Sequence, residues 1–318
     1  MTEGSGARRR AAGFSGIGRL PVCDSSIEGK MRRAEKRLRT PLISTAELAG
    51  HLSDTDWLVA DCRFELGKPE AGVIAWRAGH IPGALHADLE RDLAAPVTPT
   101  TGRHPLPSVA DFAATLSRLG IGNETRVVCY DAGPGAYAAR LWWMLRWMGH
   151  DAVAVLDGGF AAWISESRPV STEASARAPA RFVPHPRPEM VCDVGGVARA
   201  LAHGETLVDV RGAERFSGSV EPIDAVAGHV PGAVNLPFLE SLGGDGRFRA
   251  PAEIAEMWRS RTGAVQGHAP ICMCGSGVTA CHGLLALEAA GVPGGRLYAG
   301  SWSEWIRDPS RGIARSVT

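Results

Sequence analysis

The sequence predicts an α/β protein with two similar domains, each a parallel sheet with helices on both faces. Three features support this prediction: a length of 318 residues, an internal repeat, and short β-branched runs that alternate with helical segments. A chain this long exceeds the usual size of a single domain. Strands that alternate with helices form parallel sheets, and ligands bind where such strands end.

The internal repeat divides the chain into two halves. Three segments recur in the same order, 58–63 with 207–211, 78–84 with 227–233, and 156–163 with 297–305. A repeat of this length indicates duplicated domains and not a solenoid. We expect the domains at residues 41–168 and 191–310. Residues 169–190 between them are rich in Pro, Ala and Ser, which favours an extended, semi-rigid linker.

Helices and strands alternate in the same order in both halves. In the first, Ser44 and Glu47 form a capping box that opens a helix. The elements expected after it are strand 57–61, helix 108–119, strand 126–131, helix 137–148 and strand 152–156. The second half should have a helix from Asp193, strand 206–210, helix 251–259, strand 270–273, helix 278–290 and strand 296–298.

Composition limits the classes of function. Basic and acidic residues balance at 34 each, which gives no support for binding nucleic acid, and no apolar run of membrane-spanning length occurs. Residues 1–40 hold ten Lys or Arg against four Asp or Glu, and we expect a disordered basic tail there, or a translation start at Met31. Residues 311–318 should form a C-terminal tail. Without a signal peptide, the seven scattered cysteines indicate reduced thiols in the cytoplasm.

Cys274 is the candidate nucleophile. It lies between a predicted strand and a predicted helix, in the loop Cys-Gly-Ser-Gly-Val-Thr at 274–279. Backbone N–H groups and the helix dipole at such a position favour a thiolate. The first half has Asp131 at the aligned position, so we expect one active site per chain. We expect no metal, because the spacing of Cys272 and Cys274 is tighter than zinc sites use.

The motifs together resemble the rhodanese family of sulfurtransferases. They are G-H-[IV]-P-G-A and D-x-R in both halves, G-S-W-x-E-W near the C-terminus, and the cysteine loop. The loop C-G-S-G-V-T-A looks like that of 3-mercaptopyruvate sulfurtransferases. Thiosulfate sulfurtransferases of the animal type usually carry basic residues where this chain has Gly275 and Ser276. The resemblance implies two tandem rhodanese-like domains, the first without a nucleophile, and no cofactor.

The resemblance also implies roles for individual residues. Cys274 would carry the sulfur as a persulfide, with the N–H groups from Gly275 through Gly277 and Val278 to Thr279 around it. Arg215 would bind the donor's carboxylate. Ser276, His104 and Glu90 would form a relay across the two domains, with Glu90 where the family usually has Asp. A second arginine of the family is missing from 221–226, and Arg247 and Arg249 are the candidates to take its place.

Small molecules are therefore the expected partners: a sulfur donor and a thiol or cyanide acceptor. The oligomeric state is left open. Thiosulfate is the alternative donor, and a non-catalytic binding module is an alternative function. A phosphatase would need Arg six residues after the cysteine, where this chain has Ala280. Asp61 with Arg63 and Asp209 with Arg211 recur in both halves, as do His80 and His229, so structural roles are expected for them. Trp142, Trp143, Trp147 and Cys281 are expected to pack.

Overall fold

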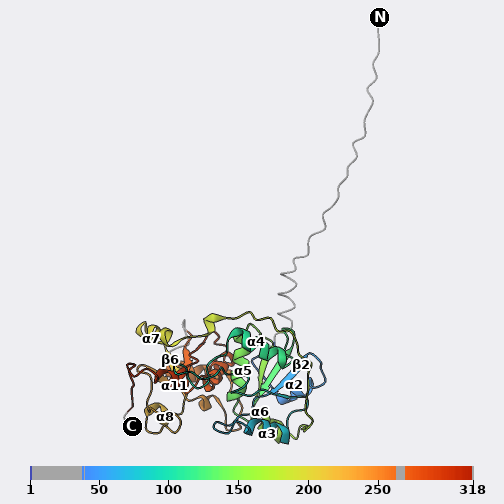
Figure 1. Ribbon diagram of the computed structural model, residues 1–318, viewed down its shortest axis with the longest axis horizontal. Coiled ribbons are helices and arrows are strands. Elements are labelled where there is room, and N and C mark those ends of the chain that lie inside the picture. Colours follow the sequence, from blue (N-terminus) through green and yellow to red (C-terminus); the bar gives the residue numbers. More distant parts are fainter. Residues whose placement is uncertain (2–37, 39, 263–268, 317–318) are drawn as a thin grey trace. The chain divides into compact units, whose positions relative to one another are not determined.

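The first half forms a five-stranded parallel sheet in a computed structural model of the chain (Figure 1). The structure describes residues 1, 38, 40–262 and 269–316; the expected basic tail and the alternative start at Met31 therefore lie outside the described residues. The strand order is β1-β5-β4-β2-β3, with β1 Leu42–Ile43, β2 Trp57–Asp61, β3 Leu85–His86, β4 Arg126–Tyr130 and β5 Val153–Leu156.

The second half repeats this sheet with four parallel strands. Their order is β7-β6-β8-β9, with β6 Leu207–Asp209, β7 Val234–Asn235, β8 Ile271–Met273 and β9 Arg296–Leu297. A parallel bridge between Val191 and Leu297 takes the place that β1 has in the first sheet. The described residues of both halves belong to one compact unit.

Helices connect the strands and cover both sheets, as the sequence predicts. In the first half they are α2 Thr45–Ala49, α3 Ala71–Ala78, α4 Val109–Arg118, α5 Ala136–Trp147 and α6 Gly159–Ser165. In the second half they are α7 Val194–Ala202, α8 Ala213–Ser217, α9 Pro251–Thr262, α10 Thr279–Ala289 and α11 Ser301–Trp305, with the 3-10 turns η1 Pro188–Met190 and η2 Phe238–Ser241. Within the described part of the chain, no helix is both long and apolar enough to cross a membrane.

In each half a buried Asp–Arg ion pair at the end of a strand is linked to the glycine of the G-H-x-P-G segment. Arg63 binds Asp61 through Nε and Nη2 and also donates to the Gly79 carbonyl oxygen. Arg211 makes the matching bonds to Asp209 and to the Gly228 carbonyl oxygen. Both aspartates have no solvent exposure, so each carboxylate depends on its arginine for charge compensation. These pairs are structural in both halves.

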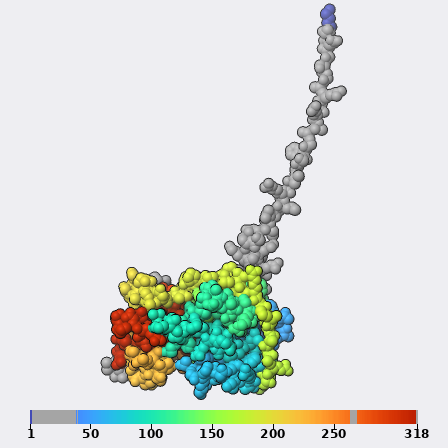
Figure 2. Space-filling model, in the orientation of Figure 1, coloured from blue at the N-terminus to red at the C-terminus, as the bar shows by residue number. Residues whose placement is uncertain are grey.

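The linker runs along the surface of the first half (Figure 2, yellow-green). Ser171 pairs with His80, and Phe182 is buried against the core. Ala314 pairs with His229 in the same antiparallel way. Residues 169–190 and 311–316 therefore contribute equivalent extended segments, each closing the G-H-x-P-G turn of its own half.

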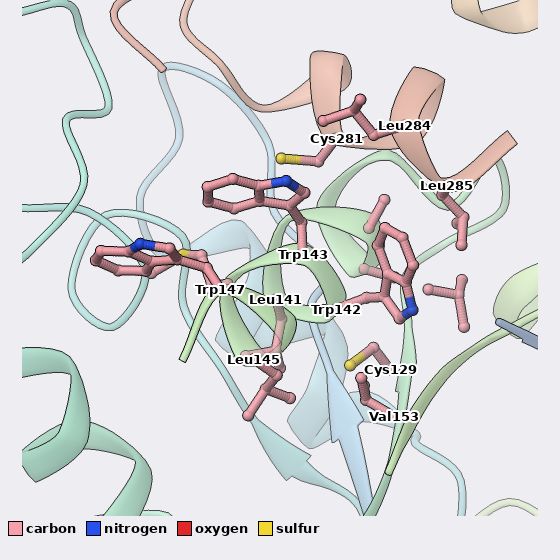
Figure 3. Packing of buried hydrophobic residues seen from close by; sticks show 14 of the residues in the cluster. Cys129, Leu141, Trp142, Trp143, Leu145, Trp147, Val153, Cys281, Leu284 and Leu285 are labelled. Atoms are coloured by element: carbon pink, nitrogen blue, oxygen red, sulfur yellow. The ribbon is translucent and has the colours of Figure 1, made fainter. Parts of the chain in front are cut away.

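Helices α5 and α10 pack against each other between the two sheets (Figure 3). Trp142, Trp143 and Trp147 of α5 are nearly fully buried there, together with Cys281 of α10. Burying aromatic side chains of this size contributes a large share of the stability of such a contact. The core is continuous between the halves, because residues of both belong to one buried apolar cluster.

The loop after β4 shows what replaces the nucleophile in the first half. The Asp131 carboxylate accepts hydrogen bonds from the backbone N–H groups of Gly133, Gly135, Tyr137 and Ala138. Burial raises the pKa of Asp131, and these N–H groups act in the opposite direction. The side chain thus fills an anion cradle at the start of α5.

We expect Asp131→Ala to destabilise the protein by about 2–4 kcal/mol, because it leaves several buried N–H groups without an acceptor. Urea unfolding at pH 7 measures this. Asp54→Ala, at an exposed surface position, is the control and should change stability by less than about 0.5 kcal/mol. Equal stability of the two variants would contradict the structural role of Asp131.

Candidate active site

A cavity of about 160 Å³ opens at the C-terminal end of β8, and both halves line it. The first half contributes Phe64, Leu66, Leu89, Arg103, His104 and Tyr137, and the second contributes Arg215, Ile223, Cys274, Gly275, Ser276, Val278 and Thr279. The predicted nucleophile, loop and arginine therefore meet in one place. Two site residues were predicted in the first half, His104 and Glu90. His104 lines the cavity, and Glu90 does not.

Cys274 directly follows β8, and only 2% of its surface is exposed. The backbone N–H of Gly277 donates to its sulfur at 3.1 Å. Gly277 has a φ of +77°, and a Cβ there would lie 2.3 Å from the Ala299 carbonyl oxygen. Only glycine fits this position, because any side chain would push the loop off its support. The loop thus holds a hydrogen-bond donor ready for negative charge on the sulfur.

Residues at the start of α11 hold the Cys274 loop through hydrogen bonds to its backbone. The Ser301 hydroxyl accepts the N–H of Cys274, and the N–H groups of Trp302 and Ser303 donate to the carbonyl oxygens of Cys274 and Gly275. Ser301 has a φ of +53°, which is unusual for a residue other than glycine. In the first half Gly159 adopts nearly the same φ, +57°. The serine keeps the strained geometry and adds a hydroxyl beneath the nucleophile.

His104 and Ser276 are hydrogen bonded across the two halves. The distance from His104 Nδ1 to Ser276 Oγ is 2.8 Å, and both side chains are buried. Burial lowers the pKa of His104 to about 4, and the positive charges of Arg140 and Arg103 act in the same direction. The imidazole is therefore neutral at pH 7, and Nδ1 can accept the serine proton.

Arg140 of α5 holds the two halves together beneath the cavity. It has no solvent exposure and donates to the carbonyl oxygen of Gly277 in the cysteine loop. It also donates to the carbonyl oxygens of Leu93 and His104. Burial lowers the pKa of Arg140. One guanidinium group thus fixes the histidine segment of the first half against the nucleophile loop of the second.

Arg215 and Arg103 stand side by side over Gly275. A Cβ at Gly275 would lie 2.9 Å from Arg103 Nη2 and 3.5 Å from Arg215 Nη1. Arg215 also binds Glu221 and Asp224, and Arg103 binds the other oxygen of Asp224. Arg103 Nε is buried without an acceptor among the described residues. Two guanidinium groups therefore present N–H donors next to the nucleophile loop.

Arg103 occupies the place for which the sequence suggested Arg247 or Arg249, and that suggestion was wrong. Arg247 binds Glu166 and reaches the Asp157 carbonyl oxygen. Arg249 donates to the Glu240 carbonyl oxygen. Neither side chain lines the cavity that holds Cys274. The second arginine that lines the cavity, Arg103, comes instead from the first half, where it precedes His104.

Glu90, the predicted acid of the relay, is exposed. Its backbone N–H donates to Asp88, and no carboxylate of the described residues is hydrogen bonded to His104. The structure thus brings Cys274, Ser276, His104 and Arg215 together and leaves Glu90 outside the cavity lining.

Two further cysteines, Cys272 and Cys281, lie near Cys274. Burial raises the pKa of Cys281 to about 12, and it raises the pKa of Cys272 as well. The Cys281 thiol donates to the Gly277 carbonyl oxygen at 3.4 Å. Both therefore remain neutral thiols at pH 7, and Cys281 packs in the core as expected. No cluster of three potential metal ligands occurs among the residues that the structure describes.

Comparison with known proteins identifies the family. Residues 44–166 and 194–308 each match the rhodanese-like domain. The chain belongs to the rhodanese family. It is 47% identical over 276 residues to a protein of Pseudomonas aeruginosa named as a probable 3-mercaptopyruvate sulfurtransferase, covering 86% of this chain and 97% of that one.

Other members of the rhodanese family are named after thiosulfate or after 3-mercaptopyruvate. A thiosulfate sulfurtransferase of Bos taurus is 40% identical over 236 residues, covering 71% of this chain and 77% of the relative. The solved structure of a 3-mercaptopyruvate sulfurtransferase from Leishmania major is similar to this chain with a TM-score of 0.75 at 32% identity, covering 85% of this chain and 76% of that chain. The two-domain architecture expected from the repeat is confirmed.

Sequence reasoning missed four residues of this rhodanese site. They are Arg103, Arg140, Asp224 and Ser301. Arg103 could have been noticed as the cation preceding His104, and Ser301 as the serine where the first half has Gly159. Arg140 lies within an apolar helix, and Asp224 lies in the segment 221–226, which has no arginine. The residues around these two positions give no sequence signal for a place at the site.

The lowered pKa of His104 should make stability depend on pH. A histidine in the unfolded chain titrates near 6.5, so the unfolded state binds more protons than the native state down to about pH 4. The stability that comes from neutral His104 is therefore present above about pH 6.5 and is lost as the pH falls toward 4.

Between pH 7 and pH 4 the free energy of unfolding should fall less in His104→Asn than in the wild type, by as much as about 3 kcal/mol, because Asn does not titrate. Chemical unfolding at a series of pH values from 7 to 4 measures the effect. His203→Asn, at an exposed position after α7, is the control and should keep the wild-type slope. Identical slopes for all three proteins would contradict the buried, neutral state of His104.

Proposed function

We propose that this protein is a sulfurtransferase that moves sulfur from 3-mercaptopyruvate to a thiol or to cyanide through a persulfide on Cys274. The family supports sulfur transfer in general. The observation that carries the donor assignment is the bond between His104 and Ser276, which sets a hydroxyl two residues from the nucleophile. The persulfide carrier, the relay and the acceptor are parts of this proposal.

In the first step the Cys274 thiolate attacks the sulfur of the donor. A sulfur–sulfur bond forms, the carbon–sulfur bond breaks, and its electron pair stays on the carbon fragment as the enolate of pyruvate. The N–H of Gly277, 3.1 Å from the sulfur, is placed to stabilise the charged sulfur. A proton then converts the enolate into pyruvate, and the Ser276 hydroxyl is positioned to deliver it.

The neutral imidazole of His104 suits a relay of that proton. Because its pKa is lowered to about 4, His104 stays uncharged through the neutral range. The donor's own thiol supplies the proton that balances this step: the Ser276 hydroxyl takes that proton while giving its own to His104 Nδ1 through the 2.8 Å bond. The imidazolium then returns the proton through Ser276 to the enolate carbon, which leaves pyruvate and a persulfide anion on Cys274. Glu90 stays a predicted member of the relay, and its exposed position means that it would have to act from outside the cavity lining.

In the second step the acceptor attacks the outer sulfur of the persulfide. The sulfur–sulfur bond breaks, its electron pair returns to Cys274 as thiolate, and the product is thiocyanate or a new persulfide. The cycle is balanced without an oxidant, and we propose that it needs no cofactor. The backbone around the loop, from Gly275 to Thr279, would surround the outer sulfur.

Arg215 and Arg103 would bind the donor's carboxylate. Both present N–H groups over Gly275, whose missing side chain leaves room for them. Charge-assisted bonds from two guanidinium groups can orient a carboxylate bidentately. The loop 274–279 contains no Lys or Arg, whereas a dianionic donor such as thiosulfate would favour basic side chains there. Thiosulfate is the second candidate, because the same two arginines can bind sulfonate oxygens and a bovine relative bears that substrate's name.

We place the reaction in the cytoplasm. The six cysteines of the described part of the chain are free thiols, which suits a reducing compartment. The expected partners are small molecules, with no role for nucleic acid or for a membrane. The oligomeric state stays open.

Cys274→Ser should reduce thiocyanate formation from either donor to background, because the hydroxyl is a poor sulfur nucleophile. The assay traps sulfur with cyanide and follows thiocyanate. Cys192→Ser is the matched control: Cys192 is also buried but does not line the cavity, so its rate should stay close to wild type. Transfer by the Cys274→Ser enzyme would refute the proposal.

Ser276→Ala should lower kcat for 3-mercaptopyruvate by about tenfold or more and affect thiosulfate less, because leaving sulfite needs no proton on carbon. Ser260→Ala, on the exposed face of α9, is the control and should leave both rates unchanged. An equal loss with both donors would mean that Ser276 serves the loop and not the enolate. A wild-type preference for thiosulfate above about tenfold in kcat/KM would reverse the donor assignment.

A further inference from the structure

One carboxylate joins the two arginines that face the cavity. Asp224 Oδ2 accepts from Arg215 Nη2 at 2.9 Å, and Asp224 Oδ1 accepts from Arg103 Nη1. The two oxygens are thus divided between the two halves of the chain. Only 4% of the Asp224 side chain is exposed, so water screens its charge weakly.

The segment that carries Asp224 is held in place by Glu221. The Glu221 carboxylate accepts the backbone N–H groups of Ile223 and Asp224 at 3.1 and 3.0 Å. It also binds Arg215 and Arg211. Burial raises the pKa of Glu221, but the bonds from Arg215 and the two N–H groups outweigh it and hold the pKa below its usual value. Asp224 therefore sits on a rigid turn and not on a free loop.

The charges of this cluster cancel before any donor binds. Arg103 and Arg215 supply two positive charges at the cavity, and Asp224 and Glu221 supply two negative charges. Arg211 shares Glu221, but its own charge is already balanced by Asp209. A monoanionic donor therefore adds one negative charge to a neutral site, whereas a dianion adds two. Each donor is repelled by the fixed charge of Asp224, and the dianion is repelled more.

We propose that Asp224 is a specificity-determining residue that makes this site prefer a monoanionic carboxylate donor over a dianionic one. The inference rests on the proposed sulfur transfer at Cys274 and adds the rule by which donors are selected. Asp224 acts through the two guanidinium groups that it bridges. It leaves Arg215 Nη1 and Arg103 Nη2 directed at Gly275 for the donor, and it removes the excess positive charge that a dianion requires.

The test compares kcat/KM for thiosulfate and for 3-mercaptopyruvate in the wild type and in Asp224→Asn. The amide keeps the size of the side chain and removes its charge. The ratio of thiosulfate to 3-mercaptopyruvate should rise by about tenfold or more, which corresponds to about 1.4 kcal/mol. Asp224→Ser removes the charge with a smaller side chain and should move the ratio in the same direction, which keeps the test valid if one variant folds poorly.

Two further variants control for arginine placement and for general effects. Asp224→Glu keeps the charge and should keep the ratio near the wild-type value. Asp151→Asn is the matched control, because Asp151 also joins two arginines, Arg146 and Arg187, away from the cavity of Cys274. Its ratio should equal that of the wild type.

An unchanged or lowered ratio in folded Asp224→Asn and Asp224→Ser would overturn the inference. So would an equal loss with both donors, since Asp224 would then only place the arginines. These outcomes differ from failure of the proposed function, in which the wild type itself would transfer sulfur from neither donor.

Discussion

A buried guanidinium group joins the two halves where the site forms. Arg140 comes from the first half and binds the Gly277 carbonyl oxygen, in the loop that also places an N–H on the sulfur of Cys274. The same group binds the carbonyl oxygen of His104. A fully buried arginine is costly unless its donors are used, and here Nη1 and Nη2 find carbonyl acceptors in both halves. The Cys274 loop and His104 are therefore fixed relative to each other by one side chain.

Duplication explains why a single site arises from two similar folds. Each half ends its central strand in a loop whose backbone N–H groups favour negative charge. In the first half, Asp131 permanently occupies its own cradle. In the second, Cys274 takes that position, and the N–H of Gly277 donates to its sulfur. The first half then supplies Arg103 and His104 to the cavity that holds Cys274, so both halves are needed to form it.

Much of the fold and part of the site could be predicted from the sequence, because they depend on local patterns. Most of the predicted strands contain buried β-branched residues, and the glycines after Cys274 indicate the loop there. Three two-residue strands were not predicted, because they are too short to leave a periodic signal: Leu42–Ile43, Leu85–His86 and Val234–Asn235. Arg103 and Asp224 were not predicted as site residues, because their ion pair forms only when the two halves pack together. Glu90 illustrates the converse, since a motif position does not ensure a place in the cavity.

The central claim is that Cys274 alone carries sulfur, in a site built from both halves. Mass spectrometry of the wild-type chain after reaction with 3-mercaptopyruvate, followed by peptide mapping, tests it most directly. The account predicts one added sulfur atom per chain, located on Cys274 and removed by cyanide. Added sulfur on another cysteine, or none on Cys274 while pyruvate is released, would contradict it.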